Sequence, residues 1–386
     1  MRHADNTSRG FTLLELTISL ALGLIVLAAT ATLFYQSVKV NWVTSQRAEL
    51  QSDFRAASNL LQRDIGMAGS GSLGQQGLAA GSVAMPSGVG VTVPVYPCSA
   101  SACTYDNGVP VAYPGTAPAY YLYSVIPGPN LGITVNGQQS DIITLSYTDA
   151  NLAMNCYTVS YVSTTSLLFT LPAVLPSTCI LPTGVAAPQP LNAPVVGLQV
   201  GNMIMVTTTN GPAAVGVVSG PVVAGTTPCG ATTCTTYTVP FALGDPGHIN
   251  QPAILTGTIA SLAGQTLSSA VRMLVITYYL DISPMDGVTP RLMRIQSGQA
   301  PVPVAENVSY MKFTYDVDSG GTYYAAQSTL PAGTNPTMIT KINIAHLTMR
   351  SQLPGMSGYQ GLDLQTSITP RNLTFGQEYP VSGSSY

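Results

Sequence analysis

Charged side chains are scarce in this sequence. Only 8% of its 386 residues are Asp, Glu, Lys or Arg, against about a quarter in an average soluble protein. The formal net charge is −3, so no basic surplus is present that would attract phosphate groups. We therefore expect no binding of nucleic acid through a general positive charge.

Catalytic signatures are also missing. The three histidines, His3, His248 and His346, have neither H-x3-H nor H-E-x-x-H spacing, and the chain has no G-x-S-x-G or Walker-type loop. The acidic residues are too few and too scattered to nominate the paired carboxylates of a glycosidase. We therefore expect that the chain is not an enzyme and needs no cofactor.

One short stretch offers oxygen ligands for a metal. Asp316 and Asp318, in "DVDSGG", could present two carboxylates to Ca²⁺, but the further ligands of an EF-hand loop are missing. A β-turn is the favoured interpretation of this stretch. No other metal site is expected.

The cysteines fall into successive pairs along the chain. Two of these pairs share the spacing C-x4-C. In an oxidising compartment we expect neighbours to be joined, although six cysteines allow about fifteen connectivities. The alternative is a four-cysteine zinc site built from the two C-x4-C pairs. The expected disulfides are Cys98–Cys103, Cys156–Cys179 and Cys229–Cys234.

A long apolar run begins at Phe11 and ends at Tyr35, with Glu15 as its single charge. As a helix it would span roughly 37 Å, enough to cross a bilayer. Arg2 and Arg9 precede it, which favours a cytoplasmic N-terminus and an exported remainder. A secretory signal cleaved within "AATATLFYQS" is the alternative.

The helical pattern continues beyond the apolar run. Residues 36–67 contain no Pro, and no Gly before Gly66. We therefore predict one helix from about residue 11 to 66, apolar all round in residues 11–35 and amphipathic in residues 36–68. The amphipathic part should lie against the chain's own globular part. Its apolar residues at helical spacing are Val43, Leu50, Phe54, Ala57, Leu61 and Ile65.

Strand signals dominate after the helix. Segments rich in β-branched and aromatic residues alternate with Gly, Pro, Ser and Asn clusters. No long amphipathic helix interrupts them, so the sheets should be antiparallel. We predict an α+β fold, with the long N-terminal helix packed on a large, loop-rich β head over residues 69–386. Within this head, residues 75–270 are a possible insertion or elaboration.

The start of the apolar run resembles the class III signal of type IV pilin-like proteins. The family pattern is a short basic leader ending in Gly, then Phe or Met, then an apolar helix with Glu at its fifth position. Gly10, Phe11 and Glu15 match this pattern, and Arg9 directly precedes Gly10. The resemblance implies that residues 1–10 are a leader removed by a prepilin peptidase between Gly10 and Phe11, and that Phe11 is then N-methylated.

The resemblance also implies a role for Glu15 in subunit assembly. A carboxylate inside a membrane helix costs a few kcal/mol, about 2.5–3.5 on insertion scales. The amino group of Phe11, from the same or a neighbouring subunit, could neutralise it in a filament. The other interpretation is a tolerated carboxylate near the membrane interface.

Within the class, the chain is similar to PilW-type minor pilins. The similarity lies in "RAELQSDFRAASNLLQRDIGMAG" at the helix end and in dispersed segments of residues 275–373. It implies a minor pilin of the inner membrane, with its head in the periplasm, that helps to prime a type IV pilus or lies at the tip of the pilus on the cell surface. The implied partners are other minor and major pilins, the prepilin peptidase and the inner-membrane assembly platform.

Three other interpretations share these features. The chain could be a minor pseudopilin of type II secretion, or a tip adhesin that acts in cell adhesion through its large head. It could also be an ordinary membrane-anchored periplasmic protein.

Overall fold

The computed structural model describes residues 12–70, 82–84, 121–149, 151–209, 213–230, 232–245, 249–250, 257–282, 289–296, 299–334, 336–352, 359–370 and 373. The chain divides into two compact units. Residues 1–52 with 351–361 form the first unit, and residues 53–350 with 362–386 form the second.

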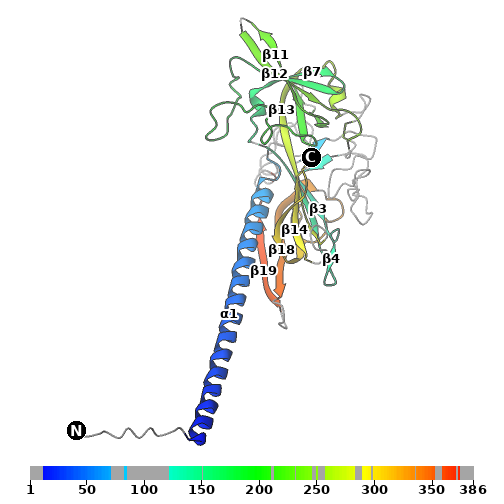
Figure 1. Ribbon diagram of the computed structural model, residues 1–386. Helices are drawn as coiled ribbons and strands as arrows, with labels where there is room; N and C mark the ends of the chain where they lie inside the picture. The colour runs from blue at the N-terminus through cyan, green and yellow to red at the C-terminus, as the bar shows by residue number, and fades with distance from the viewer. Residues whose placement is uncertain are drawn as a thin grey trace, which may run out of the picture. The chain divides into compact units, whose positions relative to one another are not determined.

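One unbroken helix, α1 (Leu13–Met67), accounts for 55 residues (Figure 1). The prediction of a single helix over residues 11–66 is therefore correct to within two residues. Side chains 12–37 are all exposed. Near the other end, Ala57, Leu61 and Ile65 are fully buried, which matches the spacing of the predicted amphipathic face.

The helix ends where Gly69 adopts a left-handed backbone conformation, with φ of 79°. A residue with a side chain rarely adopts this conformation. The Gly69 amide then donates to Ser146 O at 2.9 Å, and the Thr148 amide donates to Ser70 O at 2.9 Å. The chain therefore leaves the helix along the strand that contains Ser146.

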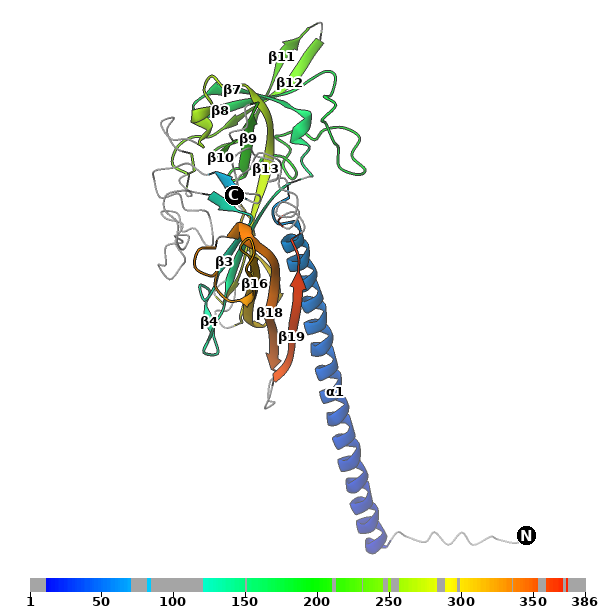
Figure 2. The same cartoon turned by 180° about the vertical axis from the view of Figure 1, so that it is seen from behind.

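The largest sheet has seven strands, ordered β10-β9-β13-β14-β15, with β6 paired to β13 and β3 paired to β6. The long strand β13 pairs with β9 along residues 267–273, with β6 along 273–278 and with β14 along 276–281. Figure 2 shows β9 and β10 beside β13. The strands are β3 (Val125–Gly128), β6 (Ile142–Thr148), β9 (Met203–Thr208), β10 (Ala213–Val217), β13 (Leu267–Asp281), β14 (Arg291–Gln296) and β15 (Val302–Glu306).

A four-stranded sheet, ordered β11-β12-β8-β7, lies over the first half of β13. Its strands are β7 (Thr158–Ser163), β8 (Ser166–Leu171), β11 (Val223–Cys229) and β12 (Thr232–Pro240). A long segment without strands, residues 172–202, connects β8 of this sheet to β9 of the seven-stranded sheet.

A second four-stranded sheet has the order β17-β16-β18-β19. Asp141, just before β6, joins it to the seven-stranded sheet, because its carboxylate accepts from the Lys312 ammonium at 2.6 Å and from the Phe313 amide at 2.9 Å. The strands are β16 (Val308–Asp318), β17 (Tyr323–Gln327), β18 (Ile339–Gln352) and β19 (Tyr359–Ile368).

The small elements complete the described structure. β1 (Ser82–Ala84) pairs with β2 (Tyr121–Tyr123), and β4 (Thr134–Val135) pairs with β5 (Gln138–Gln139). Short 3₁₀ turns cover Met154–Cys156, Ile259–Leu262 and Pro336–Met338.

Two hydrophobic clusters lie on the two faces of the seven-stranded sheet. Strand β9 shows the division, because successive side chains of a strand point to opposite faces. Ile204 and Val206 belong to the cluster under the β7–β8–β12 sheet, which also contains Phe169. Met203 and Met205 belong to the cluster on the other face.

The predicted fold class is confirmed. One long apolar helix precedes a large β-rich head, and every strand pairing whose register is described is antiparallel. The seven-stranded sheet takes β3, β6, β9 and β10 from residues 75–270 and β14 and β15 from later residues, and β13 spans the boundary at residue 270. Residues 75–270 and the later residues therefore share one sheet.

Candidate functional site: the N-terminal helix

The first turn of α1 is closed by a reciprocal pair of hydrogen bonds between Thr12 and Glu15. The Glu15 amide donates to Thr12 Oγ1 at 3.3 Å, and the Thr12 amide donates to Glu15 Oε2 at 3.1 Å. Thr12 Oγ1 also donates to Glu15 Oε2, at 3.0 Å. This is a capping box, in which two backbone donors of the helix end find side-chain acceptors. Glu15 therefore has a local partner within its own chain.

Hydroxyl groups in the apolar part of α1 also bond locally. Ser19 Oγ donates to Glu15 O at 2.7 Å, Thr30 Oγ1 to Val26 O at 2.9 Å and Thr32 Oγ1 to Ala28 O at 2.8 Å. In a hydrocarbon environment, an unsatisfied polar group costs several kcal/mol, on the order of 4–8 for a transfer without a hydrogen bond. These bonds let the exposed, apolar part of the helix carry hydroxyl groups into lipid.

The far end of α1 carries a buried ionic group, the Asp64 cluster, made of Arg63, Asp64, Tyr147, Tyr278 and Arg294. Asp64 is fully buried. Its Oδ1 accepts from Tyr147 Oη at 2.9 Å, and its Oδ2 accepts from Tyr278 Oη at 2.7 Å and from Arg294 Nε at 2.9 Å. Arg63 also reaches Oδ1, at 3.1 Å, from an exposed position. The cluster joins the last turns of the helix to β6, β13 and β14.

Burial and the Asp64 charge set the protonation of the groups around it. Burial first, and then the Asp64 carboxylate, raise the pKa of Tyr147 to about 12. The same two causes raise the pKa of Tyr278. Burial alone would lower the pKa of Arg294, but the adjacent carboxylate outweighs it and the pKa is raised. Both phenols therefore stay protonated as donors and Arg294 stays charged.

Sequence reasoning missed Asp64, because it selected only the apolar residues of this part of the helix. A signal was present: Asp64 follows Leu61 by three residues and precedes Ala68 by four, so it lies on the same helical stripe. A carboxylate in the last turn also faces the negative end of the helix dipole. Such a position requires donors from elsewhere in the fold.

The two residues expected at the leader cleavage, Gly10 and Phe11, lie outside the described residues. Cleavage and methylation therefore stay predictions. Of the N-terminal residues that the resemblance selects, only Glu15 has a described position, in the capping box with Thr12.

Two disulfides are present in the described residues, Cys156–Cys179 and Cys229–Cys234. They are two of the three neighbour pairs that the sequence favoured; Cys98 and Cys103 lie outside the described residues. Since Cys229 and Cys234 bond to each other, they are not available as a thiolate pair for the alternative zinc site.

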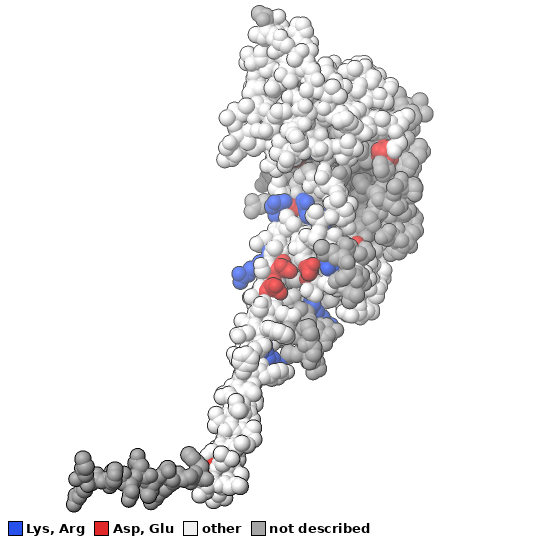
Figure 3. Space-filling view, viewed as in Figure 1, with Lys and Arg blue, Asp and Glu red and all other residues white. Residues whose placement is uncertain are grey.

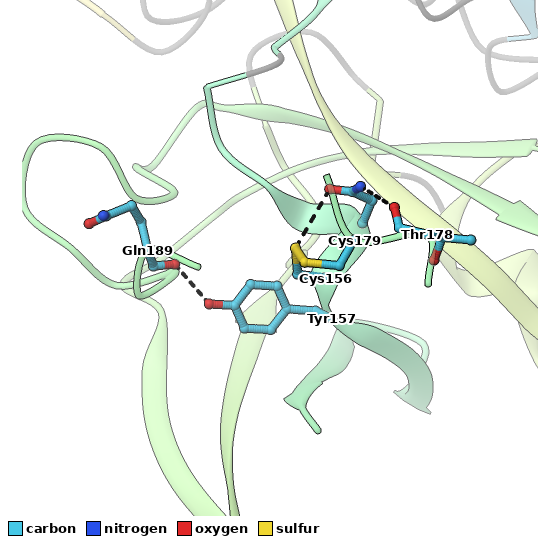
Figure 4. Close-up of a disulfide and its surroundings, with 6 residues drawn as sticks. Cys156, Tyr157, Thr178, Cys179 and Gln189 are labelled. Carbon is cyan, nitrogen blue, oxygen red and sulfur yellow. Dashed lines mark hydrogen bonds between the residues drawn. A yellow bond between two sulfur atoms is a disulfide. The ribbon is translucent and has the colours of Figure 1, made fainter. Parts of the chain in front are cut away.

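The first disulfide lies at the start of the long segment between β8 and β9. Figure 4 shows the bond between Cys156 and Cys179, with Tyr157 beside it. Tyr157 Oη donates to Gln189 O at 2.8 Å, and its ring packs edge-on against Tyr237 of β12, with the ring centroids 5.8 Å apart. The segment is therefore bonded at Cys179 and at Gln189 to the two residues that directly precede β7, Cys156 and Tyr157.

The carboxylates considered for Ca²⁺ have other partners. Asp316 accepts from Tyr323 Oη at 2.7 Å, from the Ala326 amide at 2.8 Å and from Asn343 Nδ2 at 3.0 Å. Lys341 lies 3.3 Å away. Asp318 accepts from the Gly320 amide at 3.1 Å, as expected in a turn. Among the residues that the structure describes, no group of three His, Cys, Asp or Glu side chains could hold a metal ion.

Comparison with known proteins identifies the N-terminal segment. Residues 5–31 match the family model described as the prokaryotic N-terminal methylation motif. No curated protein and no solved structure matches the chain. The chain therefore carries a prepilin-type signal, which supports a type IV pilin-like protein. In the described part of the chain, α1 is the one helix long and apolar enough to cross a membrane, and together with the signal it indicates membrane anchoring.

Proposed function

We propose that the chain is a minor pilin of a type IV pilus. In this role it is inserted in the inner membrane with its head in the periplasm, and it then joins other pilins at the start or tip of the filament. The observation that carries the proposal is the methylation motif at residues 5–31, which runs directly into a helix with an exposed apolar surface. The role proposed for the chain is structural, without catalysis.

The capping box supports a specific role for Glu15 in subunit assembly. Before assembly, the Thr12 amide and hydroxyl occupy one carboxylate oxygen, Oε2. Cleavage before Phe11 would create a charged amino group close to this carboxylate. The carboxylate could then pair with that amino group, or with the one of a neighbouring subunit, because a charge pair in hydrocarbon is far less costly than a lone charge.

The first test examines processing. The chain is purified from membranes of cells with and without a prepilin peptidase, and the N-terminus is determined by sequencing and intact mass. We expect a chain that starts at methylated Phe11 only when the peptidase is present. A mature chain that starts at Met1, or after Ala31, would reject the proposal.

The second test examines assembly. Glu15→Gln should reduce recovery of the chain in sheared pili by about tenfold or more, the effect of losing an ion pair worth a few kcal/mol. The matched control is Glu49→Gln, an exposed acid on the same helix. Normal recovery of Glu15→Gln would contradict the role of Glu15. Normal pili with a defect in protein secretion would instead indicate a secretion pseudopilin.

A further inference from the structure

A cleft of about 650 Å³ opens in the head, between the segment that precedes β9 and the strands β13 and β14. Among the described residues, its polar lining is almost entirely amide side chains, with Arg272 as the one charged residue; the amides are Gln199, Asn202, Gln296 and Gln299. We call it the amide cleft. Its volume lies in the range of small-molecule sites, about 300–1,000 Å³.

The wall that carries Gln199 and Asn202 is held in place by tight backbone bonds. The Gly197 amide donates to Ala193 O at 3.0 Å, and the Leu198 amide donates to Leu191 O at 2.7 Å. A side chain at Gly197 would place its Cβ only 2.5–2.6 Å from backbone atoms of Ala193 and Leu191. A glycine is therefore required for this turn, and the wall is preorganised before any ligand arrives.

The positive charge of Arg272 is not available to a ligand in the cleft. Its guanidinium forms an ion pair with the buried Asp149, and Nη1 donates to the carbonyl oxygens of Val196 and Gly197 at 3.1 and 2.8 Å. Its role is to hold the wall against β13. The positive charge of Arg272 is therefore already neutralised by Asp149 and would not attract an anionic ligand.

The amides keep free hydrogen-bonding groups. Asn202 is only 3% exposed; its Oδ1 accepts from the Gln199 amide at 3.0 Å, whereas its Nδ2 donates to no group among the described residues. Gln199 Nε2 donates to Ala193 O and Pro194 O at 3.2 Å, which leaves Oε1 as an acceptor. The side chains of Gln296 and Gln299 have no hydrogen-bond partner in the described part of the chain. Asn202 Nδ2 is not one of the fully buried side-chain atoms without a partner among the described residues, so this donor is open to a ligand or water in the cleft that accepts.

The part of the chain that forms the Gln199 and Asn202 wall of the cleft is also uncharged. No Lys or Arg occurs between Arg63 and Arg272, and residues 151–240, which include β7 to β12, contain no Asp, Glu, Lys or Arg at all. Figure 3 shows this part of the head almost without blue or red. Asp141, Asp149 and Asp245 are each at most 8% exposed. Long-range electrostatic attraction can therefore contribute little to binding here.

From these contacts we propose that the amide cleft binds an uncharged saccharide. Each hydroxyl of a sugar both donates and accepts, so one ring can satisfy the Asn202 Nδ2 donor and the Gln199 Oε1 acceptor together. A peptide is less well matched, because the apolar side chains that the described residues contribute to the lining are the short Pro194, Val195 and Val200, which are poor partners for an anchoring side chain. This binding function is separate from assembly and does not rest on it.

The test uses the full chain in phosphatidylcholine nanodiscs and saturation-transfer NMR. The probes are cellobiose, maltose, lactose and chitobiose, with sialyllactose and digalacturonate as charged comparisons and a Gly/Ser hexapeptide as the peptide. Empty nanodiscs give the background. Two variants remove amides of the cleft, Asn202→Ala and Gln296→Ala, and Gln139→Ala removes an exposed amide of β5 outside the cleft.

We expect millimolar binding of at least one neutral disaccharide, with a Kd that changes less than about twofold when NaCl rises from about 50 to 500 mM. Gln296→Ala and Asn202→Ala should each raise this Kd by about two- to tenfold, the effect of one lost hydrogen bond. Gln139→Ala should leave it unchanged. Because Asn202 is buried and its variant could misfold, the Gln296→Ala result decides between the outcomes.

Three results would overturn the proposal. One is the absence of a signal from every neutral saccharide at about 10 mM. Another is a signal only from a charged saccharide or only from the peptide, which would assign the cleft to that ligand class. The last is saccharide binding that Gln296→Ala and Gln139→Ala affect equally. None of these results would affect the test of N-terminal processing.

Discussion

At the scale of single residues, Asp64 is the side chain whose surroundings most need an explanation. It combines full burial, a place in the last helical turn and four donor groups from three strands and its own helix. A buried ion pair is weak evidence of net stabilisation, but removing one partner leaves the other charge uncompensated. We therefore expect Asp64 to disfavour other positions of the helix end, in which its charge would be buried without these donors.

We expect Asp64→Asn to destabilise the head by about 3–5 kcal/mol, because Arg294 then loses its counter-charge in a largely buried position. Urea unfolding of the full chain in detergent micelles, followed by tyrosine fluorescence, would measure the change. Asp53→Asn serves as the control, since Asp53 lies on the same helix, half-buried. Equal midpoints for the two variants would contradict the importance of the cluster.

Asp316 gives stability a dependence on pH. Burial alone would raise its pKa, but the hydrogen bonds from Ala326, Tyr323 and Asn343 outweigh burial and lower the pKa from its ordinary value of 3.8. A carboxylate whose pKa is lowered on folding contributes stability above its unfolded pKa, and this contribution is lost as the pH falls through the folded value.

Asp316→Asn should therefore lower stability at pH 7 by about 1–3 kcal/mol. The difference from wild type should shrink at about pH 3, because below the ordinary pKa of 3.8 the unfolded chain binds a proton at Asp316 more readily than the folded chain does. Urea midpoints at both pH values test this. The control, Asp318→Asn, changes an exposed carboxylate in a turn and should have little effect. A difference in urea midpoint between Asp316→Asn and wild type that is the same at both pH values would contradict this prediction.

At the scale of elements, the polar groups at the two ends of α1 find their hydrogen-bond partners in different ways. Its first turns satisfy their polar groups locally, through the capping box and the hydroxyl-to-carbonyl bonds. This arrangement suits a lipid or a filament core, where water is absent. Its last turns use donors from β6, β13 and β14 instead. One helix can therefore serve both as a membrane segment and as part of a globular core.

The position of the segment 172–202 depends on a contact with a distant part of the chain, the disulfide between Cys156 and Cys179. Cys156 and Cys179 are 23 positions apart, whereas Cys229 and Cys234 are 5 apart at the hairpin of β11 and β12. In the loop-entropy model the longer loop gains about 3.5 kcal/mol and the shorter about 2 kcal/mol.

We therefore expect Cys156→Ala with Cys179→Ala to lower the unfolding free energy more than Cys229→Ala with Cys234→Ala. The first pair should also increase proteolytic cutting of residues 172–202 by a non-specific protease, because the segment loses a tie to the sheet. Mass spectrometry of the fragments would locate the cuts. Equal cutting in both double variants would contradict the role of the Cys156–Cys179 bond.

At the scale of the whole molecule, charge is divided unevenly over the head. Residues 151–240 carry no charged side chain, whereas β16 and β18 with their neighbours carry the ion pairs Asp141–Lys312 and Asp316–Lys341. Asp363 also lies here, hydrogen-bonded to His346. The sheet of β7, β8, β11 and β12 is instead stabilised by hydrophobic contacts and two disulfides.

Acid should therefore weaken the two sheets unequally. Hydrogen bonds outweigh burial and lower the pKa of Asp316 and Asp363, so stability around β16 and β18 falls as the pH drops below about 4. Hydrogen-exchange protection factors of the full chain at pH 7 and about pH 3 should fall in β16 and β18 and stay higher in β8 and β12. A uniform loss of protection would count against this division.

The sequence alone determined the helix, its length and the antiparallel strands, because these follow from patterns between residues a few positions apart. It also determined the prepilin-type signal, which is a local motif. The positions of Gly10 and Phe11 in a leader, and the Cys98–Cys103 pair, stay predictions because they lie outside the described residues.

Only the tertiary structure decided which residues surround the helix end and which residues line the cleft. Asp64 meets Tyr147, Tyr278 and Arg294 from 83, 214 and 230 positions away, and the amide cleft brings Asn202 beside Arg272 and Gln296. No periodicity links residues at such distances, because their proximity depends on which strands pair with β13. Sheet order is set by the packing of the whole core, and local sequence carries little information about it.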